Sequence, residues 1–249
     1  MKNKNLSWKL ATLLIVSVGL CWSQDAKQLT RDQVSTIKKK LVATFNALGE
    51  APKGYRSDEK NESYGLPTEY YESEGSPNLL YANAHRDYTF KTAEDDQKAM
   101  TEKIRAAQAK GDMQEVMRLS QEMQSKVMQM AASAESNPPI RVDIYFNRSE
   151  TETIDPDAVL FEGSGFIALK SKQGENEGNE RVRIYFDPIT LKETKALSKV
   201  EFTQDESGSG KKFSPTTVKY ITVEFSGPIT SVEAWAKKAN TKVILSQIN

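Results

Sequence analysis

Two nearly identical heptapeptides set the strongest constraint on how this chain can fold. Arg-Val-Asp-Ile-Tyr-Phe-Asn at 141–147 returns as Arg-Val-Arg-Ile-Tyr-Phe-Asp at 181–187, with five of seven residues identical at an offset of 40. Apolar and polar residues alternate in both copies, which is the period of a β-strand with one buried face. Two copies are too few for a solenoid. Internal duplication and a shared alternating constraint explain the similarity equally well.

Further apolar segments extend this strand pattern along the C-terminal half. They are 159–161, 200–202, a third unit from Val218 through Phe225, 232–236 and 243–245. Turn residues separate them, so we predict consecutive antiparallel hairpins with polar loops at 172–180 and 205–212. Residues 79–91 form another predicted strand. Its alternation places His85, the only histidine, on the polar face, where a solvated side chain is expected rather than a general base.

Two helical regions are predicted. Residues 30–48 are amphipathic, with a capping box at Thr30 and Gln33 and a stop at Gly49. Residues 92–136 are typical of a helical hairpin, because Gly111 can end one helix and Asp112 can cap the next. So short a join forces the two helices to pack antiparallel.

The second helix of this hairpin holds five of the seven methionines within 18 positions. An apolar seam at heptad spacing consists of Met113, Val116, Met123, Val127 and Met130, and Met117 and Met128 flank it. Packing against a neighbouring helix or sheet is the favoured interpretation, and an adaptable surface for an apolar ligand or partner is the alternative. A thioether copper site is disfavoured, because no second His or nearby Cys completes the coordination.

Residues 49–78 lack periodicity and carry seven acidic against three basic residues. This composition indicates a long loop or linker. Four tyrosines are unusual there: Tyr55, Tyr64, Tyr70 and Tyr71. They either pin the loop onto the sheet, which we favour, or present a recognition surface, for which Tyr70 and Tyr71 are the candidates.

Residues 1–23 have the pattern of an export signal. Lys2, Lys4 and Lys9 precede an apolar stretch of 11 residues at 10–20, which is shorter than the roughly 20 residues that span a bilayer. Cleavage is predicted after Ser23, leaving Gln24 as the new terminus. A lipid anchor on Cys21 is the less favoured alternative. Removing this segment takes three bases and no acids, which leaves a formal net charge of −3.

The composition excludes several functions. The chain has 34 basic and 34 acidic residues, which argues against nucleic-acid binding. One cysteine rules out an internal disulfide, and no phosphate-binding loop or serine nucleophile motif is present. Asp155 and Asp157 are read as an acidic turn rather than a cation site. No cofactor and no metal site are predicted.

We therefore expect an α+β fold with an antiparallel sheet of about eight strands. An N-terminal helix and an inserted helical hairpin are expected to cover this sheet, which can curl into a half-barrel. The predicted segments are a signal at 1–23, a helix at 24–48, a loop or linker at 49–78, and an α+β domain at 79–249 that includes the hairpin at 92–136.

The expected function is that of an exported, non-catalytic binding or interaction module, periplasmic or secreted, without a transmembrane span in the mature chain. Its expected partner is a protein or an apolar small molecule. The candidate contact residues are Met113, Met117, Met123, Met130, Tyr70 and Tyr71. The alternatives are an envelope hydrolase that uses paired carboxylates and a structural envelope component. An apolar cavity beside the methionines would favour a carrier, and a polar cleft with convergent carboxylates would favour an enzyme.

Overall fold

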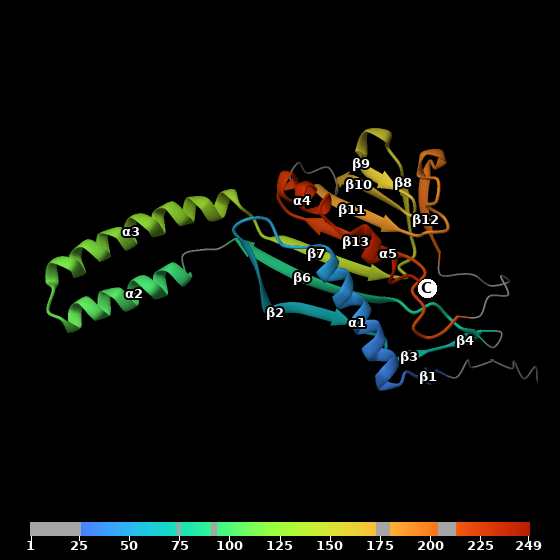
Figure 1. Ribbon diagram of the computed structural model, residues 1–249, viewed down its shortest axis with the longest axis horizontal. Coiled ribbons are helices and arrows are strands. Elements are labelled where there is room, and N and C mark those ends of the chain that lie inside the picture. The colour runs from blue at the N-terminus through green and yellow to red at the C-terminus, as the bar shows by residue number, and fades with distance from the viewer. Residues whose placement is uncertain (1–25, 74–75, 91–93, 173–179, 204–212) are drawn as a thin grey trace, which may run out of the picture.

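A seven-stranded antiparallel sheet forms the centre of the computed structural model, which describes residues 26–73, 76–90, 94–172, 180–203 and 213–249 (Figure 1). The strand order is β2-β6-β7-β13-β11-β10-β9, and this linear order leaves the sheet open rather than closed into a barrel. The α+β class and the antiparallel sheet are confirmed. In sheet order the strands are Tyr55–Gly65, Ala82–Phe90, Ile140–Phe146, Ile221–Ser226, Glu180–Phe186, Phe166–Lys172 and Val159–Gly163.

One face of the sheet is covered by helices. The N-terminal helix α1 (Arg31–Ala47) begins with the predicted capping box, in which Thr30 Oγ1 accepts from the Gln33 amide and the Gln33 side chain accepts from the Thr30 amide. Ile37, Leu41 and Phe45 lie one turn apart on α1 and are buried against the sheet. This helix and residues 79–249 therefore share one hydrophobic core.

Two C-terminal helices complete this layer, which corrects our expectation of strands at 232–236 and 243–245. They are α4 (Ile229–Ala236) and α5 (Thr241–Leu245). Val232 and Trp235 of α4 are buried at a helical spacing, and the Trp235 indole donates to the Leu48 carbonyl at 2.9 Å. Short apolar runs fit a strand and a helix alike, so the sequence did not distinguish the two.

The two heptapeptides lie on either side of one strand. β7 and β11 both pair with β13 in the same register, so Ile221 lies between Phe146 and Phe186. Two residues further along β13, Val223 lies between Ile144 of the first copy and Ile184 of the second. The apolar side chains of both copies point to the helix-covered face, and the polar ones point to the opposite face.

This opposite face, which we call the polar face, is partly covered by a two-stranded ribbon of β8 (Glu150–Thr153) and β12 (Lys199–Phe202). Val200 and Phe202 of β12 pack on Tyr185 and Tyr220 in a second, smaller cluster. β12 thus pairs with β8 rather than with a sequence neighbour. The consecutive hairpins that we predicted are seen in β9-β10-β11.

The predicted loop or linker at 49–78 is wrong in its central part, where β2 forms an edge of the sheet. The register between β2 and β6 shifts between Ser57 and Glu62, and such a bulge inverts the side-chain alternation within one strand. Tyr55 is buried, and its hydroxyl donates to the Pro138 carbonyl at 3.0 Å. The outer part of the region forms only short pairs, of β1 (Lys27–Gln28) with β3 (Glu69–Tyr70) and of β4 (Glu72–Ser73) with β5 (Ser76–Pro77).

The helical hairpin has the predicted elements, α2 (Glu94–Ala109) and α3 (Met113–Ser136), joined through Gly111 with a positive φ of 72°. Contrary to our expectation, the hairpin does not cover the sheet. It is inserted between β6 and β7 and extends away from the body (Figure 1). Among the side chains that the structure describes, the buried and partly buried ones of the hairpin form a cluster of their own: Met100, Ile104, Ala107, Val116, Leu119 and Met123. This part of the apolar seam therefore packs between the two helices and not against the sheet.

No helix within the described residues is both long enough and apolar enough to cross a membrane. The predicted signal segment, with Cys21, Ser23 and Gln24, lies outside the described residues.

Candidate functional site

The methionines of α3 divide into two groups. Met113, Met117 and Met128 are exposed, with 66%, 64% and 80% of their surface accessible. Met123 instead packs inside the hairpin with Val116. Leu119, one turn on from Val116, is the third residue of the actual seam, so the predicted seam was only partly correct. The side chains of Val127 and Met130 lie outside the described part of the chain.

The exposed methionines share one face of α3, because positions 113, 117 and 128 are spaced four and eleven residues apart. The exposed Gln121 and Gln124 fall on the same face. We call these five residues the methionine stripe. It contains no charged residue and no aromatic ring.

Four charged side chains of α3 that the structure describes lie on a separate face and form ion pairs with one another. Arg118 forms ion pairs with Glu115 at 2.7 Å and Glu122 at 3.3 Å, and Lys126 pairs with Glu122 at 2.9 Å. α3 therefore has three faces: an inner seam, a charged side and the methionine stripe.

The two groups of methionines predict opposite mutational effects. Met117→Ala is expected to change the free energy of unfolding by less than about 0.5 kcal/mol, because the side chain is exposed. Met123→Ala is expected to cost the hairpin about 1.5–3 kcal/mol, since it removes a packed thioether. Thermal melts followed by far-ultraviolet circular dichroism compare the two. Equal losses would show that the exposed side chain carries packing energy.

The tyrosine candidates do not join the stripe. Tyr70 lies in β3 opposite Lys27, and Tyr71 is exposed just after it. β3 lies across the body from the hairpin (Figure 1). Tyr55 and Tyr64 fix β2 in place, as the favoured interpretation of these tyrosines expects. The Tyr55 hydroxyl donates to the Pro138 carbonyl, and the Lys38 ammonium lies 4.8 Å from the centre of the Tyr64 ring.

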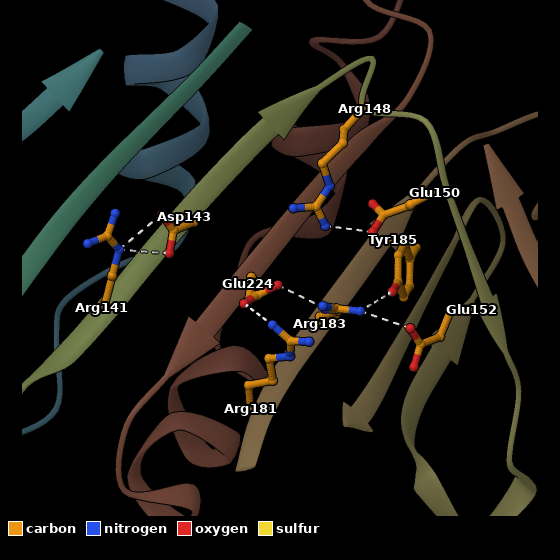
Figure 2. A network of polar contacts seen from close by, with 9 residues as sticks. All are labelled: Arg141, Asp143, Arg148, Glu150, Glu152, Arg181, Arg183, Tyr185 and Glu224. Carbon is orange, nitrogen blue, oxygen red and sulfur yellow. Dashed lines mark hydrogen bonds and ion pairs between the residues drawn. The ribbon is translucent and has the colours of Figure 1, made fainter. Parts of the chain in front are cut away.

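A second site lies on the polar face, where ion pairs link neighbouring strands (Figure 2). Glu224 of β13 accepts from Arg181 at 2.7 Å and from Arg183 at 2.8 Å, both of β11. Arg183 also donates to Glu152 of the ribbon at 2.8 Å and contacts the Tyr185 hydroxyl at 3.5 Å. This network ties β13, β11 and the ribbon together.

Two further ion pairs flank the network. Arg141 bonds both oxygens of Asp143 at 3.1 Å, and Arg148 bonds Glu150 at 2.5 Å (Figure 2). The Arg148 guanidinium also lies 3.7 Å from the centre of the Tyr145 ring. The sheet register places Asp143 directly across from Glu224 on one side and His85 on the other.

The two neighbouring carboxyl groups are shifted in opposite directions. Burial raises the pKa of Asp143, and the attraction of Arg141 offsets this only in part. Burial also acts to raise the pKa of Glu224, but the attraction of Arg183 and Arg181 outweighs burial and lowers the pKa of Glu224. Glu224 is therefore held ionised, whereas Asp143 is more readily protonated.

This difference predicts a pH-dependent effect at Asp143. Because its folded-state pKa is raised, its ionised form costs stability at neutral pH, and the cost vanishes as pH falls through the raised value. Asp143→Asn is therefore expected to raise the free energy of unfolding at neutral pH and to lose this advantage in acid. Urea denaturation across pH measures it, with Asp87→Asn on the same face as the control. A lower free energy of unfolding for Asp143→Asn than for the wild type at neutral pH would contradict a raised pKa at Asp143.

Asp155 and Asp157 lie in a turn between strands. The Asp155 side chain accepts from the Asp157 amide at 3.0 Å and caps a short 3₁₀ helix at Pro156–Ala158. A shallow cavity of about 380 Å³ adjoins it, lined by both aspartates, Glu152, Lys170 and Ser171 among others. Among the described residues, no three His, Cys, Asp or Glu side chains are grouped to hold a metal ion.

The polar network was missed at the sequence level, although its signal was visible. In both heptapeptides the polar positions share one parity: Arg141, Asp143 and Tyr145 in the first, and Arg181, Arg183 and Tyr185 in the second. Only the pairing with β13 brings Glu224 between them. Comparison with known proteins gives no precedent for either site: no family model, curated protein or solved structure matches this chain.

Proposed function

We propose that this chain is an exported, non-catalytic interaction module that binds a protein partner through the methionine stripe of α3. The observation that carries the proposal is the exposure of Met113, Met117 and Met128 on a hairpin that extends from the body (Figure 1). Apolar side chains aligned on one exposed face, beside a face whose described charges pair with one another, are typical of a contact surface. Unbranched thioethers adapt to the shape of what they contact.

The chemistry of the stripe favours a protein over a lipid surface. Helices that lie in a membrane interface carry Lys or Arg on the polar face and Trp, Phe or Leu on the apolar one. The stripe combines methionine with Gln121 and Gln124 instead, and no aromatic residue borders it. With 24 residues, α3 is about 36 Å long and offers an extended ridge to another helix.

Export is the part of this proposal that rests on residues 1–23. The expected mature species begins at Gln24, because the apolar stretch is too short to span and Ser23 meets the cleavage requirement. Intact-mass measurement of protein from its own host decides this. A species that begins at an acylated Cys21 would show a lipid anchor, and retention of Lys2 to Lys9 would contradict export by cleavage.

Methionine oxidation tests the contact directly. Limited peroxide treatment followed by mass spectrometry reports the accessibility of each thioether. In intact cells, Met113, Met117 and Met128 are expected to oxidise several-fold more slowly than in purified protein at high dilution. Met100 and Met123 are internal controls, because the hairpin shields them in both preparations. Equal rates for the exposed methionines in cells and in dilute solution would refute a bound partner.

An envelope hydrolase is the second candidate, and one observation favours it. Asp143 and Glu224 are cross-strand neighbours whose pKa values are shifted apart, as in paired carboxylates that divide acid and base roles. Against it, Glu224 is occupied by two arginines. The test is release of reducing ends from envelope polysaccharide. Activity that Asp143→Asn abolishes and Asp87→Asn retains would establish the enzyme, and absence of activity would remove this candidate.

A further inference from the structure

We infer that Asn61, on the edge strand β2, is the acceptor of an N-linked glycan in the exported protein. It begins the tripeptide Asn-Glu-Ser at 61–63, which has the Asn-x-Ser form that glycan-transferring enzymes modify. These enzymes act on proteins that leave the cytoplasm. The inference therefore rests on the export part of the proposed function, and it is independent of the methionine stripe.

The sequence holds three tripeptides of this form, and they differ in whether a glycan can be attached. The other two begin at Asn5 and Asn147. Asn5 lies in the segment whose removal is predicted. Asn147 is fully buried, and its Nδ2 atom donates to two backbone carbonyls. A bulky, solvated glycan has no room on that nitrogen in the folded chain.

Asn61 lies where β2 protrudes from the edge of the sheet. The register between β2 and β6 shifts between Ser57 and Glu62. In this interval β2 has four residues, 58–61, opposite a single residue of β6, Asp87. Extra residues of this kind leave the hydrogen-bonded ladder and bend the strand. Because glycan acceptors lie on surface loops, a protruding stretch at an open edge gives the access that modification requires.

The two side chains that the tripeptide needs point to the same side. Asn61 and Ser63 are exposed, whereas Glu62 and Tyr64 between and after them are half-buried. Glu62 pairs with Arg86 at 2.9 Å, which fixes the inward side of the strand. No hydrogen bond joins the Asn61 side chain to another group that the structure describes. Its amide nitrogen is therefore available for reaction.

The transfer is a substitution at a sugar carbon. Asn61 Nδ2 attacks the anomeric carbon of a lipid-linked oligosaccharide diphosphate, and a carbon–nitrogen bond forms. The bond from that carbon to the diphosphate oxygen breaks, and the lipid diphosphate leaves with the bonding electrons. Nδ2 releases one proton to solvent, which balances the extra negative charge of the leaving group. The step involves no oxidant or reductant.

The residue two positions before each asparagine also distinguishes the two tripeptides of the mature chain. Glu59 precedes Asn61 at this spacing, whereas Tyr145 precedes Asn147. Glycan transfer in the bacterial periplasm selects an acidic residue at this position, and transfer in a eukaryotic secretory pathway does not. The sequence around Asn61 is therefore suited to both of the expected destinations, the periplasm and the secretory route.

A glycan at Asn61 has a physical consequence for the sheet. β2 and β9 are the two end strands of the seven-stranded order, and β2 lies along the outer edge of the body (Figure 1). An open edge is a template on which a strand of another chain can pair. A hydrophilic glycan on the protruding part of β2 hinders such pairing.

Glycopeptide mass spectrometry of the mature protein from its own host tests the inference. The peptide that contains Asn61 is expected to carry an added saccharide mass, and the peptide that contains Asn147 is expected to carry none. Asn61→Gln and Ser63→Ala are each expected to lose the added mass completely. Ser63→Thr is the matched control, because it keeps the hydroxyl group, and is expected to retain the modification.

The outcomes separate this inference from export itself. A mature species that begins at Gln24 and carries no saccharide at Asn61 would overturn the inference and leave export intact. Retention of residues 1–23 would remove export and, with it, the modification. A saccharide on Asn147 instead of Asn61 would overturn the selection by burial. Thermal melts of the variants, expected to match that of the wild type produced without glycan, verify that each variant folds.

Discussion

Replacing Glu224 with glutamine is expected to lower the free energy of unfolding by about 3–5 kcal/mol, because it removes the carboxylate that neutralises two largely buried arginines. Arg183 keeps its pair with Glu152, whereas no other ion pair is found for Arg181 among the described residues. Urea denaturation at neutral pH measures the loss.

The matched control is Glu201→Gln. Glu201 pairs with Lys199 at 2.5 Å, but both side chains are more than half exposed, so the expected loss is below about 1 kcal/mol. Because the folded-state pKa of Glu224 is lowered, its contribution is present at neutral pH and is lost as pH falls through that lowered value. Similar losses for Glu224→Gln and Glu201→Gln would mean that solvent screens the network.

Replacing Asn147 with alanine is expected to cost about 3–5 kcal/mol, because three backbone groups, one buried and two partly buried, lose their hydrogen-bond partner. The Asn147 side-chain nitrogen Nδ2 donates to the carbonyls of Leu80 and Thr217 at 2.9 Å, and the side-chain oxygen Oδ1 accepts from the Lys219 backbone amide at 2.8 Å. The residue is fully buried and is the one non-glycine residue with a positive φ, 54°, in the described chain.

Asn147→Gly separates the two contributions to this loss. Glycine accepts the positive φ freely, so it removes the hydrogen bonds without the backbone strain of alanine. The glycine variant is expected to unfold at a higher urea concentration than the alanine variant, yet below the wild type. Equal stability of wild type and glycine variant would show that water replaces the amide contacts.

The fold could be predicted where one period dominates a segment. Thr30, Gln33 and the helical spacing after them specified α1, and Gly111 specified the join of the hairpin. β2 could not be predicted, because the bulge after Ser57 breaks its alternation and its acidic composition suits an exposed edge strand. α4 was missed because Val232 and Trp235 stand in a run too short to establish a helical period.

The candidate sites were predictable to a smaller extent. The concentration of methionines drew attention to α3. Heptad spacing alone could not tell which side of α3 the neighbouring helix would cover. The prediction therefore included Met113 in the apolar seam, whereas the structure has Leu119 there. The ion pairs of Glu224 depend on residues more than 40 positions away. Single-strand patterns carry no information about such partners.

The place of β13 in the sheet has a consequence for how the chain folds. β2, β6 and β7 form one half of the sheet and β11, β10 and β9 the other, and β13 alone joins them. Both flanking copies precede this strand in the chain, since it begins at Ile221. The two halves therefore cannot unite through β13 until this late strand has been synthesised. Contacts between such distant segments slow folding, so the joining of the two halves is expected to be a late step in the formation of the sheet.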